Sequence, residues 1–463
     1  MKRDRTTIDQ VANAAVTRRQ VLAGAGRAGA AVVATGLLGA RATGGALAAG
    51  RSGVSAPALH LTRTSAQAQV SGEISLAYLG TADQAAAWES LFGEFKKTYP
   101  NVTLKAQANP VNNWAGFFDA ISTQIAGGKV PDIIQVATEG QRLFASRKLV
   151  EPIDDLLERD KGELADFFED IHPNLIEWNK TYSSPDGQTY YLPGEFNTMC
   201  VWYNADLLNK AGVGEPADDW SWDDFLAIAE GVTKTGPFGF HAPAAYFVGL
   251  MPWMLTNGAS TLSTDWKTAT VDTPQAIEAA AWMRSLVEKK ISPAPGGAFD
   301  PFTAAAQDKL AMFGGGRWPV ISMRRLNAVD KMKIAVWPQK TQKGSPVGWN
   351  AYPIMKGTKN REAAWAFVKF IASKQASEYF ATQGGTIVPP RRSVANSDAF
   401  LTNAPAGSAK LYEALEYATP IPSPDKGNVV QKDIEDAWEQ ILVGNVEPEE
   451  ALNTLNEKIQ ANL

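Results

Sequence analysis

The sequence has few of the side chains from which metal and redox sites are built. Cys200 is the only cysteine in 463 residues, and it stands in an apolar segment that is typical of a buried strand. No disulfide can therefore form within the chain. Three histidines, His60, His172 and His241, lie far apart and show no metal-ligand spacing. We predict neither a metal nor a cofactor.

An unbroken apolar run of bilayer length is also missing near the start of the chain. The run after Arg18 and Arg19 is rich in glycine and interrupted by Arg27, whereas a spanning helix needs about 20 mostly apolar residues. Two adjacent arginines before a short apolar run are typical of a twin-arginine export signal. Ala46-Leu47-Ala48 has the small-x-small pattern of a signal peptidase site. We predict a signal peptide over 1–48, with an uncleaved anchor as the alternative, and a periplasmic or cell-surface location.

Basic side chains are in deficit after the predicted cleavage site. Residues 1–48 contain seven basic and two acidic residues, so the remainder has 37 basic and 47 acidic residues and a formal charge of −10. Nucleic acids and anionic membranes require basic patches, so neither is expected as the main partner. The remaining roughly 410 residues exceed what one hydrophobic core usually supports, which favours two lobes.

Strand and helix patterns alternate after a polar stretch. Residues 49–71 are rich in Ala, Ser, Gly and Gln without an apolar period, and we expect a flexible tether there. The first strands are predicted over 74–79, from 102 and over 132–136, with helices over 84–99 and 114–125 between them. Later elements are predicted over residues 199–203, 205–211, 360–372, 431–442 and 449–463, with helix starts at Ser221 and Pro274. Alternation of this kind builds an α/β fold with mostly parallel sheets.

Aromatic side chains, in contrast, are abundant, with fourteen tryptophans. Sugars present apolar C–H faces to flat rings and hydroxyls to planar polar groups, so an aromatic cleft with Asn, Asp and Glu suits a carbohydrate. Tryptophans within strand or helix stripes are expected in the core: Trp88, Trp202, Trp222, Trp282, Trp365 and Trp438. Trp318 follows three glycines and Trp349 lies between Gly348 and Asn350, so Trp318, Trp349 and Asn350 are candidate ligand contacts.

Polar residues near predicted strand ends complete the candidate site. Ligands of open α/β sheets bind at the carboxyl ends of strands. Asp83 follows the first strand, where it serves either as a hydroxyl acceptor or as a helix N-cap, and Glu139 follows the third. Arg317, beside Trp318, is either a grip on a hydroxyl or acidic group or a solvated rim charge.

Six motifs in a fixed order resemble one known family. They are "F…F…YP.V" over 91–102, "GK.PD" over 125–134, "Y..P … YN.DL" over 190–193 and 201–208, "TWDE" over 220–225, "AM..G.W" over 311–318 and "EAAW.F" over 362–367. Each is weak alone. Together, across nearly all of residues 72–463, they resemble the extracellular solute-binding proteins of ABC importers, in the sugar-binding branch typified by maltose-binding protein.

This resemblance implies a type II periplasmic-binding-protein fold, in which two α/β lobes are joined by a multi-segment hinge and close on the ligand. The crossovers are expected near Glu195–Thr198, Val336–Lys340 and Gly384–Arg391. The implied boundaries are 72–196 and 338–386 for lobe one, and 197–336 and 390–463 for lobe two.

The resemblance also implies ligand-contacting residues. Trp318 matches a position where an aromatic ring commonly stacks on sugar, and Tyr246 and Trp253 align with an aromatic stretch that lines the cleft. One of these two is expected to face the ligand. Asn197 stands where maltose-binding protein has a ligand-contacting carboxylate, and Glu195 either takes that role or serves the hinge.

The function that we predict is an extracytoplasmic receptor, a monomer, that delivers a mono- or oligosaccharide to the membrane subunits of an ABC permease. A phosphorylated polyol such as glycerol-3-phosphate is the alternative ligand and would need Arg317, Arg391 or Arg392 at the cleft. A secreted glycoside hydrolase is the alternative from another class. It would need a carboxylate pair about 5–9 Å apart, drawn from Asp83, Glu139 and Glu195, and no nucleophile motif is visible.

Overall fold

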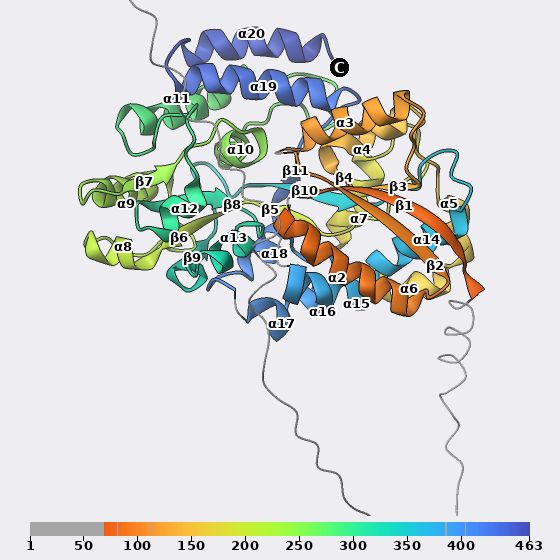
Figure 1. Cartoon of the computed structure of the whole chain (residues 1–463). Helices are drawn as coiled ribbons and strands as arrows, with labels where there is room; N and C mark the ends of the chain where they lie inside the picture. Colours follow the sequence, from red (N-terminus) through yellow and green to blue (C-terminus); the bar gives the residue numbers. More distant parts are fainter. Residues whose placement is uncertain (1–68, 81, 112, 385–386, 403) are drawn as a thin grey trace, which may run out of the picture. The chain divides into compact units, whose positions relative to one another are not determined.

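The computed structural model describes residues 69–463 apart from positions 81, 112, 385–386 and 403, which Figure 1 draws in grey together with residues 1–68. The predicted signal peptide and residues 49–68 of the predicted tether lie outside the described residues. Within the described part, no helix has both the length and the apolar character needed to cross a bilayer.

The first sheet is built from parallel strands joined by helices. Strand β1 (Gly72–Leu79) lies between β2 (Val102–Asn109) and β3 (Ile133–Ile134) and is parallel to both. Helices α2 (Ala82–Thr98) and α3 (Trp114–Ala126) make the crossovers. Their apolar stripes are buried, which explains why the helical spacing in the sequence locates both elements.

The predicted third strand divides between two sheets. Gln135 connects β3 to β4 (Val136–Ala137), and β4 pairs antiparallel with β10 (Ser345–Ala351). Strand β10 also pairs antiparallel with β5 (Phe196–Thr198) and parallel with β11 (Ala418–Pro420). Gln135 therefore stands where two sheets part, the position at which open α/β sheets bind ligands.

The third sheet has the order β7-β8-β6-β9, with β6 (Cys200–Asn204), β7 (Phe238–His241), β8 (Leu310–Gly315) and β9 (Met332–Ala335). Strand β6 is antiparallel to β8 and β9, and only β7–β8 is parallel. The α/β class is confirmed, and the expected parallel pairing holds throughout the first sheet, whereas the other two sheets are mixed. Each antiparallel pairing involves β5, β6 or β10, where the chain passes from one sheet to another, so no βαβ unit fixes their direction.

The remaining helices cover these sheets. Most bounds agree with the predicted ones within a few residues, and the predicted helix start at Ser221 has both hydrogen bonds of a capping box with Asp224. The other helical elements are α4 (Thr138–Ser146), α5 (Asp154–Arg159), α6 (Lys161–Asp170), α7 (Pro173–Tyr182), α8 (Ala205–Lys210), α9 (Trp222–Thr233), η1 (Tyr246–Leu250), α10 (Met251–Thr256), α11 (Pro274–Glu288), α12 (Pro301–Ala306), α13 (Pro319–Arg325), η2 (Val329–Lys331), α14 (Arg361–Ile371), α15 (Lys374–Tyr379), η3 (Phe380–Gly384), α16 (Arg392–Ala395), α17 (Asp398–Leu401), α18 (Lys410–Glu413), η4 (Ala414–Glu416), α19 (Gly427–Leu442) and α20 (Pro448–Gln460).

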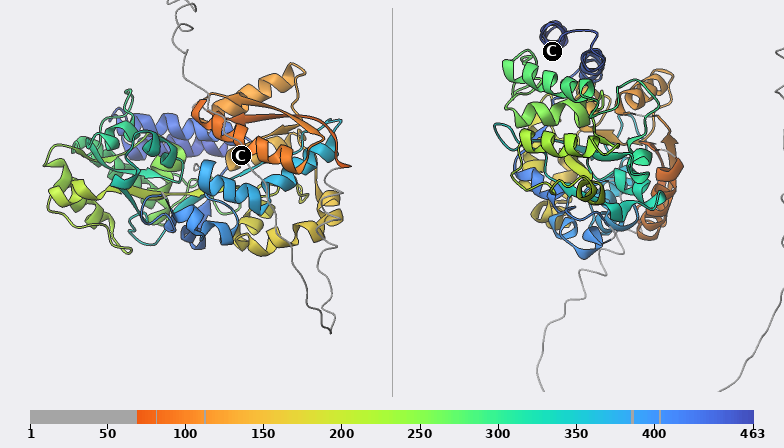
Figure 2. Two further views of the ribbon diagram at one scale, coloured as in Figure 1. Left: turned by 60° about the horizontal axis from the view of Figure 1, so that its bottom comes forward. Right: turned by 90° about the vertical axis from the view of Figure 1, so that its left-hand side faces the viewer.

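Helix α19 contacts elements that are far apart in the sequence. It packs against α20 and α11 and also contacts α3 and α4; Figure 1 shows it between α20 and the rest of the molecule, and Figure 2 shows the same helices from two other sides. Its buried stripe includes Val430, Ile434 and Trp438. This placement brings polar residues of α19 next to the residues that follow β4.

Of the residues assigned to the core from their spacing, Trp202, Trp222, Trp365 and Trp438 are buried, and Cys200 is a buried free thiol. Trp282 is half-buried. Trp88 is buried as predicted, although its ring also reaches the cleft described next.

Candidate ligand-binding cleft

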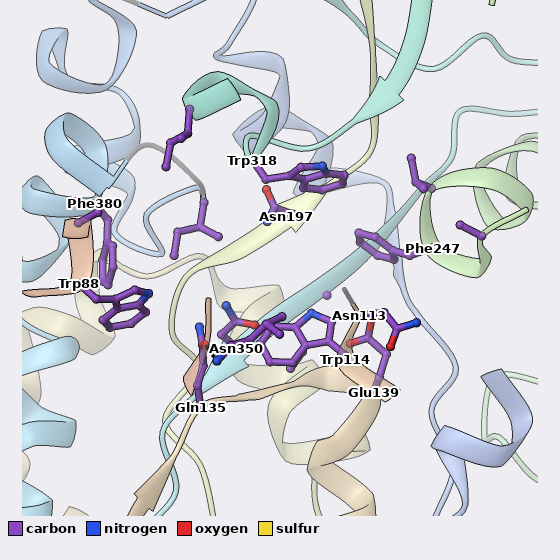
Figure 3. A pocket seen from close by; sticks show the side chains of 18 of the residues that line it. Trp88, Asn113, Trp114, Gln135, Glu139, Asn197, Phe247, Trp318, Asn350 and Phe380 are labelled. Carbon is purple, nitrogen blue, oxygen red and sulfur yellow. Dashed lines mark hydrogen bonds between the residues drawn. The ribbon is translucent and has the colours of Figure 1, made fainter. Parts of the chain in front are cut away.

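A cleft of about 390 Å³ lies beside strands β1, β4, β5 and β10, each of which contributes a lining residue. Its walls come from α2, α3, η1, the loop after β8 and η3 (Figure 3). Its polar side chains come from β5, β10, α4 and α19, and from Asn113 before α3 and Gln135 between β3 and β4. The volume is within the range of about 300–1,000 Å³ that is usual for ligand pockets.

Aromatic rings form the walls of this cleft. Figure 3 shows Trp318 and Trp114 on opposite sides of the open space, with Phe247 at one end and Trp88 and Phe380 at the other. Trp318 and Trp114 are both half-buried, so each has ring surface left to offer. Flat apolar faces on two sides of a cleft suit a flat or ring-shaped ligand.

Local structure fixes the position of each of these two tryptophans. Trp114 is the first residue of α3, directly after the N-cap Asn113, and its ring stacks on Phe118 at 5.8 Å. Trp318 ends the loop after β8. A Cβ added to Gly316 would come within 2.6 Å of the Trp318 ring and 2.5 Å of Asn197 Oδ1. A glycine at position 316 is therefore required for this packing.

Amide side chains lie between the aromatic walls. Asn197 Oδ1 accepts a hydrogen bond from the Arg317 backbone N–H at 2.8 Å. Asn350 Nδ2 donates to Glu195 Oε1 at 3.0 Å, and Gln135 Oε1 accepts from the Leu79 N–H at 3.1 Å. All three amides line the cleft and are held by neighbours behind it.

Glu195 supports these amides from behind the cleft. It is buried, and its Oε1 also accepts from the Tyr352 hydroxyl at 2.5 Å. Burial raises the pKa of Glu195, while the hydrogen bonds from Tyr352 and Asn350 oppose this rise. The cleft lining does not include Glu195.

Two carboxylates form the acidic end of the cleft. Glu139 lies in the first turn of α4, and Glu435 lies on α19 beside Gln431. Burial raises the pKa of Glu139 to about 7, and the nearby charge of Glu435 adds to the rise. Glu435 Oε1 accepts from the Gln431 amide at 3.0 Å and from the Tyr246 backbone N–H at 3.2 Å.

Four of the predicted ligand contacts line the cleft: Trp318, Glu139, Asn197 and Asn350. Asp83 lies in the first turn of α2, and its side chain is outside the described part of the chain. Of the other two carboxylates considered for a hydrolase, Glu139 lines the cleft and Glu195 does not.

Three of the predicted aromatic contacts lie instead in the core. Trp349 is 1% exposed because alternate side chains of a strand point to opposite faces, so Gly348 and Asn350 line the cleft while Trp349 packs on Trp178. Trp253 is enclosed by other aromatic rings, and the buried Tyr246 hydroxyl bonds to Thr261 at 2.6 Å. The expectation that Trp253 or Tyr246 faces the ligand is therefore wrong.

Arg317 is neither a rim charge nor a contact with the cleft. Its side chain is fully buried, with the guanidinium 3.8 Å from the Phe400 ring centroid. Its Nη2 donates to the carbonyls of Ala381 and Phe400 at 3.1 and 3.3 Å. Burial lowers the pKa of Arg317 to about 9. Arg317 is therefore neither the grip on a ligand nor the solvated rim charge that the sequence analysis considered. A residue next to a ring that faces the cleft can still point inward.

Several lining residues escaped prediction. Trp114 follows the carboxyl end of β2, so the rule that selected Glu139 applies to it as well. Phe247 is adjacent to Tyr246 in the aromatic stretch. Gln431 and Glu435 come from a helix almost 300 residues after Glu139, and nothing in their local sequence marks them as ligand contacts.

Among the described residues, no group of three or more His, Cys, Asp or Glu side chains is placed to hold a metal ion. An α/β fold with a ligand-sized, aromatic-walled cleft is typical of a protein that binds a small ligand. Residues 80–378 match the bacterial extracellular solute-binding proteins, and the chain belongs to this family. Its members are binding receptors rather than enzymes, as predicted.

Known proteins agree with this assignment. A Brucella abortus protein named only as a binding protein is 24% identical over 407 residues, which cover 82% of this chain and 92% of that protein. An ABC substrate-binding protein of Listeria monocytogenes, solved in complex with cycloalternan, has a TM-score of 0.75 at 23% identity and covers 85% of this chain and 99% of its own.

The GacH receptor of Streptomyces glaucescens, solved unliganded and in complex with acarbose and an acarbose homologue, has a TM-score of 0.73 at 22% identity. The match covers 85% of this chain and 100% of that one. These likenesses confirm the type II periplasmic-binding-protein fold that the motifs predict.

Proposed function

We propose that the protein is the extracytoplasmic receptor of an ABC importer and that it binds a mono- or oligosaccharide in this cleft. The observation that carries the proposal is the placement of Trp318 and Trp114 on opposite sides of a space bordered by Asn197, Gln135 and Asn350. Rings take the C–H faces of a sugar, and amides take its hydroxyls. The structural relatives with carbohydrate ligands support the same class.

The charges at the cleft favour a neutral sugar over a phosphorylated polyol. Within the described part of the chain, no Lys or Arg lines the cleft. Arg317 is buried against Phe400, and Arg391 is buried and donates to the Ala372 carbonyl at 2.8 and 2.9 Å. A phosphate group needs clustered cationic donors, and this cleft has none of the three arginines that the alternative requires.

We further propose that residues 72–196 with 338–386, and 197–336 with 390–463, act as two lobes that close on the ligand. Trp114 would then belong to one lobe and Trp318 to the other, so that only the closed form makes both contacts. The same proposal includes a twin-arginine signal over 1–48, a monomeric receptor and delivery to the membrane subunits of a permease. The Arg18-Arg19 pair and the extracellular family support these points.

Isothermal titration with a panel of mono- and oligosaccharides tests the ligand class. Trp318→Ala should weaken binding by about 30-fold, since loss of one stacked ring costs about 2 kcal/mol. Trp282→Ala, which removes another half-buried tryptophan that does not line the cleft, is the matched control and should keep the affinity. Chromatography of the recovered sugar should show no new product. Unchanged affinity in Trp318→Ala, or hydrolysis of the sugar, would refute the proposal.

A further inference from the structure

The acidic end of the cleft has negative charge without a matching cation. Glu139 and Glu435 both line it, and the lining contains no Lys, Arg or His among the described residues. The basic side chains of the same two helices are engaged elsewhere: Arg142 pairs with Asp425 at 2.7 Å, and Lys432 pairs with Asp436. The two carboxylates are thus left to repel each other.

The same end of the cleft has a buried acceptor without a donor. Gln431 is 8% exposed, and its amide nitrogen donates to Glu435 Oε1 at 3.0 Å. Its carbonyl oxygen is buried and has no hydrogen-bond partner in the described structure. A buried acceptor left unpaired costs about 1–3 kcal/mol, so a ligand that donates here is favoured. Within η1, Tyr246 is the titratable residue. Its hydroxyl is hydrogen-bonded to Thr261.

Aromatic faces complete a setting that attracts positive charge. Phe247 and Trp114 border the space next to Glu139 in Figure 3. The negative face of an aromatic ring attracts an ammonium group, and the attraction is larger where water is excluded. Carboxylates, an amide oxygen and ring faces in one place form a binding site for a cation that donates hydrogen bonds.

We infer that the cleft takes a carbohydrate with a basic amino group, and that Glu139, Glu435 and Gln431 hold its ammonium. The inference rests on the proposed sugar-binding function and names the class of sugar. An ammonium has three donors and no acceptor, which matches three acceptor groups. It also offsets the repulsion between the carboxylates, which a hydroxyl does not do. The raised pKa of Glu139 agrees, because it reflects a buried charge without a partner.

Matched sugar pairs test the inference directly. We would titrate the full chain at pH 7, where a substantial part of Glu139 is ionised, and at constant ionic strength. The ligands are glucose, galactose and mannose, each against its 2-amino-2-deoxy form, and cellobiose against the β-1,4-linked glucosamine dimer. At least one amino sugar should bind about tenfold or more tightly than its neutral partner, and added salt should reduce the difference. Glu139→Gln and Glu435→Gln should each reduce the preference, taken as the ratio of the two affinities within the same variant, to below about threefold.

Glu439→Gln is the control, since it makes the same change in charge at an exposed position one turn further along α19. This variant should keep the full preference. Equal binding of both members of every pair would overturn the inference and leave the sugar receptor standing. Absence of binding to every sugar would contradict the proposed function as well. Circular dichroism of each variant identifies any that fail to fold, and the wild-type comparison needs no variant.

Discussion

Glu139→Gln should change how the stability of the protein depends on pH. In the folded chain the pKa of Glu139 is about 7, against an ordinary value of 4.5, because burial disfavours the charged carboxylate. The folded state therefore binds the proton more tightly than the unfolded state. The stability that this tighter proton binding at Glu139 adds is fully present below pH 4.5 and is lost as the pH rises through 7. The difference in pKa corresponds to about 3 kcal/mol.

The variant lacks this titration, since glutamine stays neutral. The free energy of unfolding of the wild type, minus that of Glu139→Gln, should therefore fall by about 3 kcal/mol between pH 4.5 and pH 8. Groups that titrate alike in both proteins cancel in this difference, apart from the coupling to Glu435. Denaturant unfolding at several pH values, followed by tryptophan fluorescence and without ligand, measures it.

A difference that stays constant with pH would refute this reasoning, and so would one that rises. The first would mean that Glu139 is well solvated in the folded state. The second would mean that a cation of the protein holds its carboxylate charged. Glu439→Gln makes the same change in charge at an exposed position of α19 and controls for the net charge of the chain.

Three further substitutions test residues that support the cleft from behind its lining. Gly316→Ala should reduce sugar affinity at least about tenfold in titration calorimetry, because the Cβ of the alanine would meet Asn197 Oδ1 at 2.5 Å and the Trp318 ring. Circular dichroism should change little. Unchanged affinity would contradict the packing described. Arg317→Met should change sugar affinity far less than Trp318→Ala, because Arg317 is buried outside the cleft lining; equal losses of affinity would show that Arg317 acts on the ligand. Glu195→Ala should weaken binding more than Glu195→Gln, since the glutamine carbonyl still accepts from Tyr352 and Asn350; equal affinities would show that Asn350 needs no support from position 195.

Residues placed by local rules were the ones that the sequence could predict. Helical spacing located α2 and α3, the capping pair Ser221 and Asp224 located α9, and strand ends pointed to Glu139. Trp318 follows a glycine run in a loop, where its ring has room to emerge. In each case the deciding interactions lie within a few residues of the chain.

Residues placed by the pairing of distant segments could not be predicted in this way. Trp349 has glycine and asparagine neighbours like a loop residue. Yet it lies in β10, where it pairs with Phe196 of β5, and the pleat of the strand turns its ring into the core. Arg317 points inward because Ala381 and Phe400 supply carbonyls from much later in the chain. Gln431 and Glu435 reach the cleft only because α19 packs across α4.

Trp114 and Trp318, which form opposite walls of the cleft, come from different parts of the chain. This arrangement affects how ligand binding would be coupled to closure of the two proposed lobes. Trp114 precedes β5 in the chain and Trp318 follows it, and each ring is anchored in its own surroundings, Trp114 against Phe118 and Trp318 beside Gly316. A sugar that touches only one ring has the same affinity for an open and a closed receptor and shifts nothing. If the two proposed lobes close on the ligand, a sugar that touches both rings binds the closed form more tightly, and this difference in affinity would drive the closure. The wild type should therefore show a ligand-induced decrease in radius of gyration by small-angle scattering, and Trp318→Ala at saturating ligand should show a smaller one.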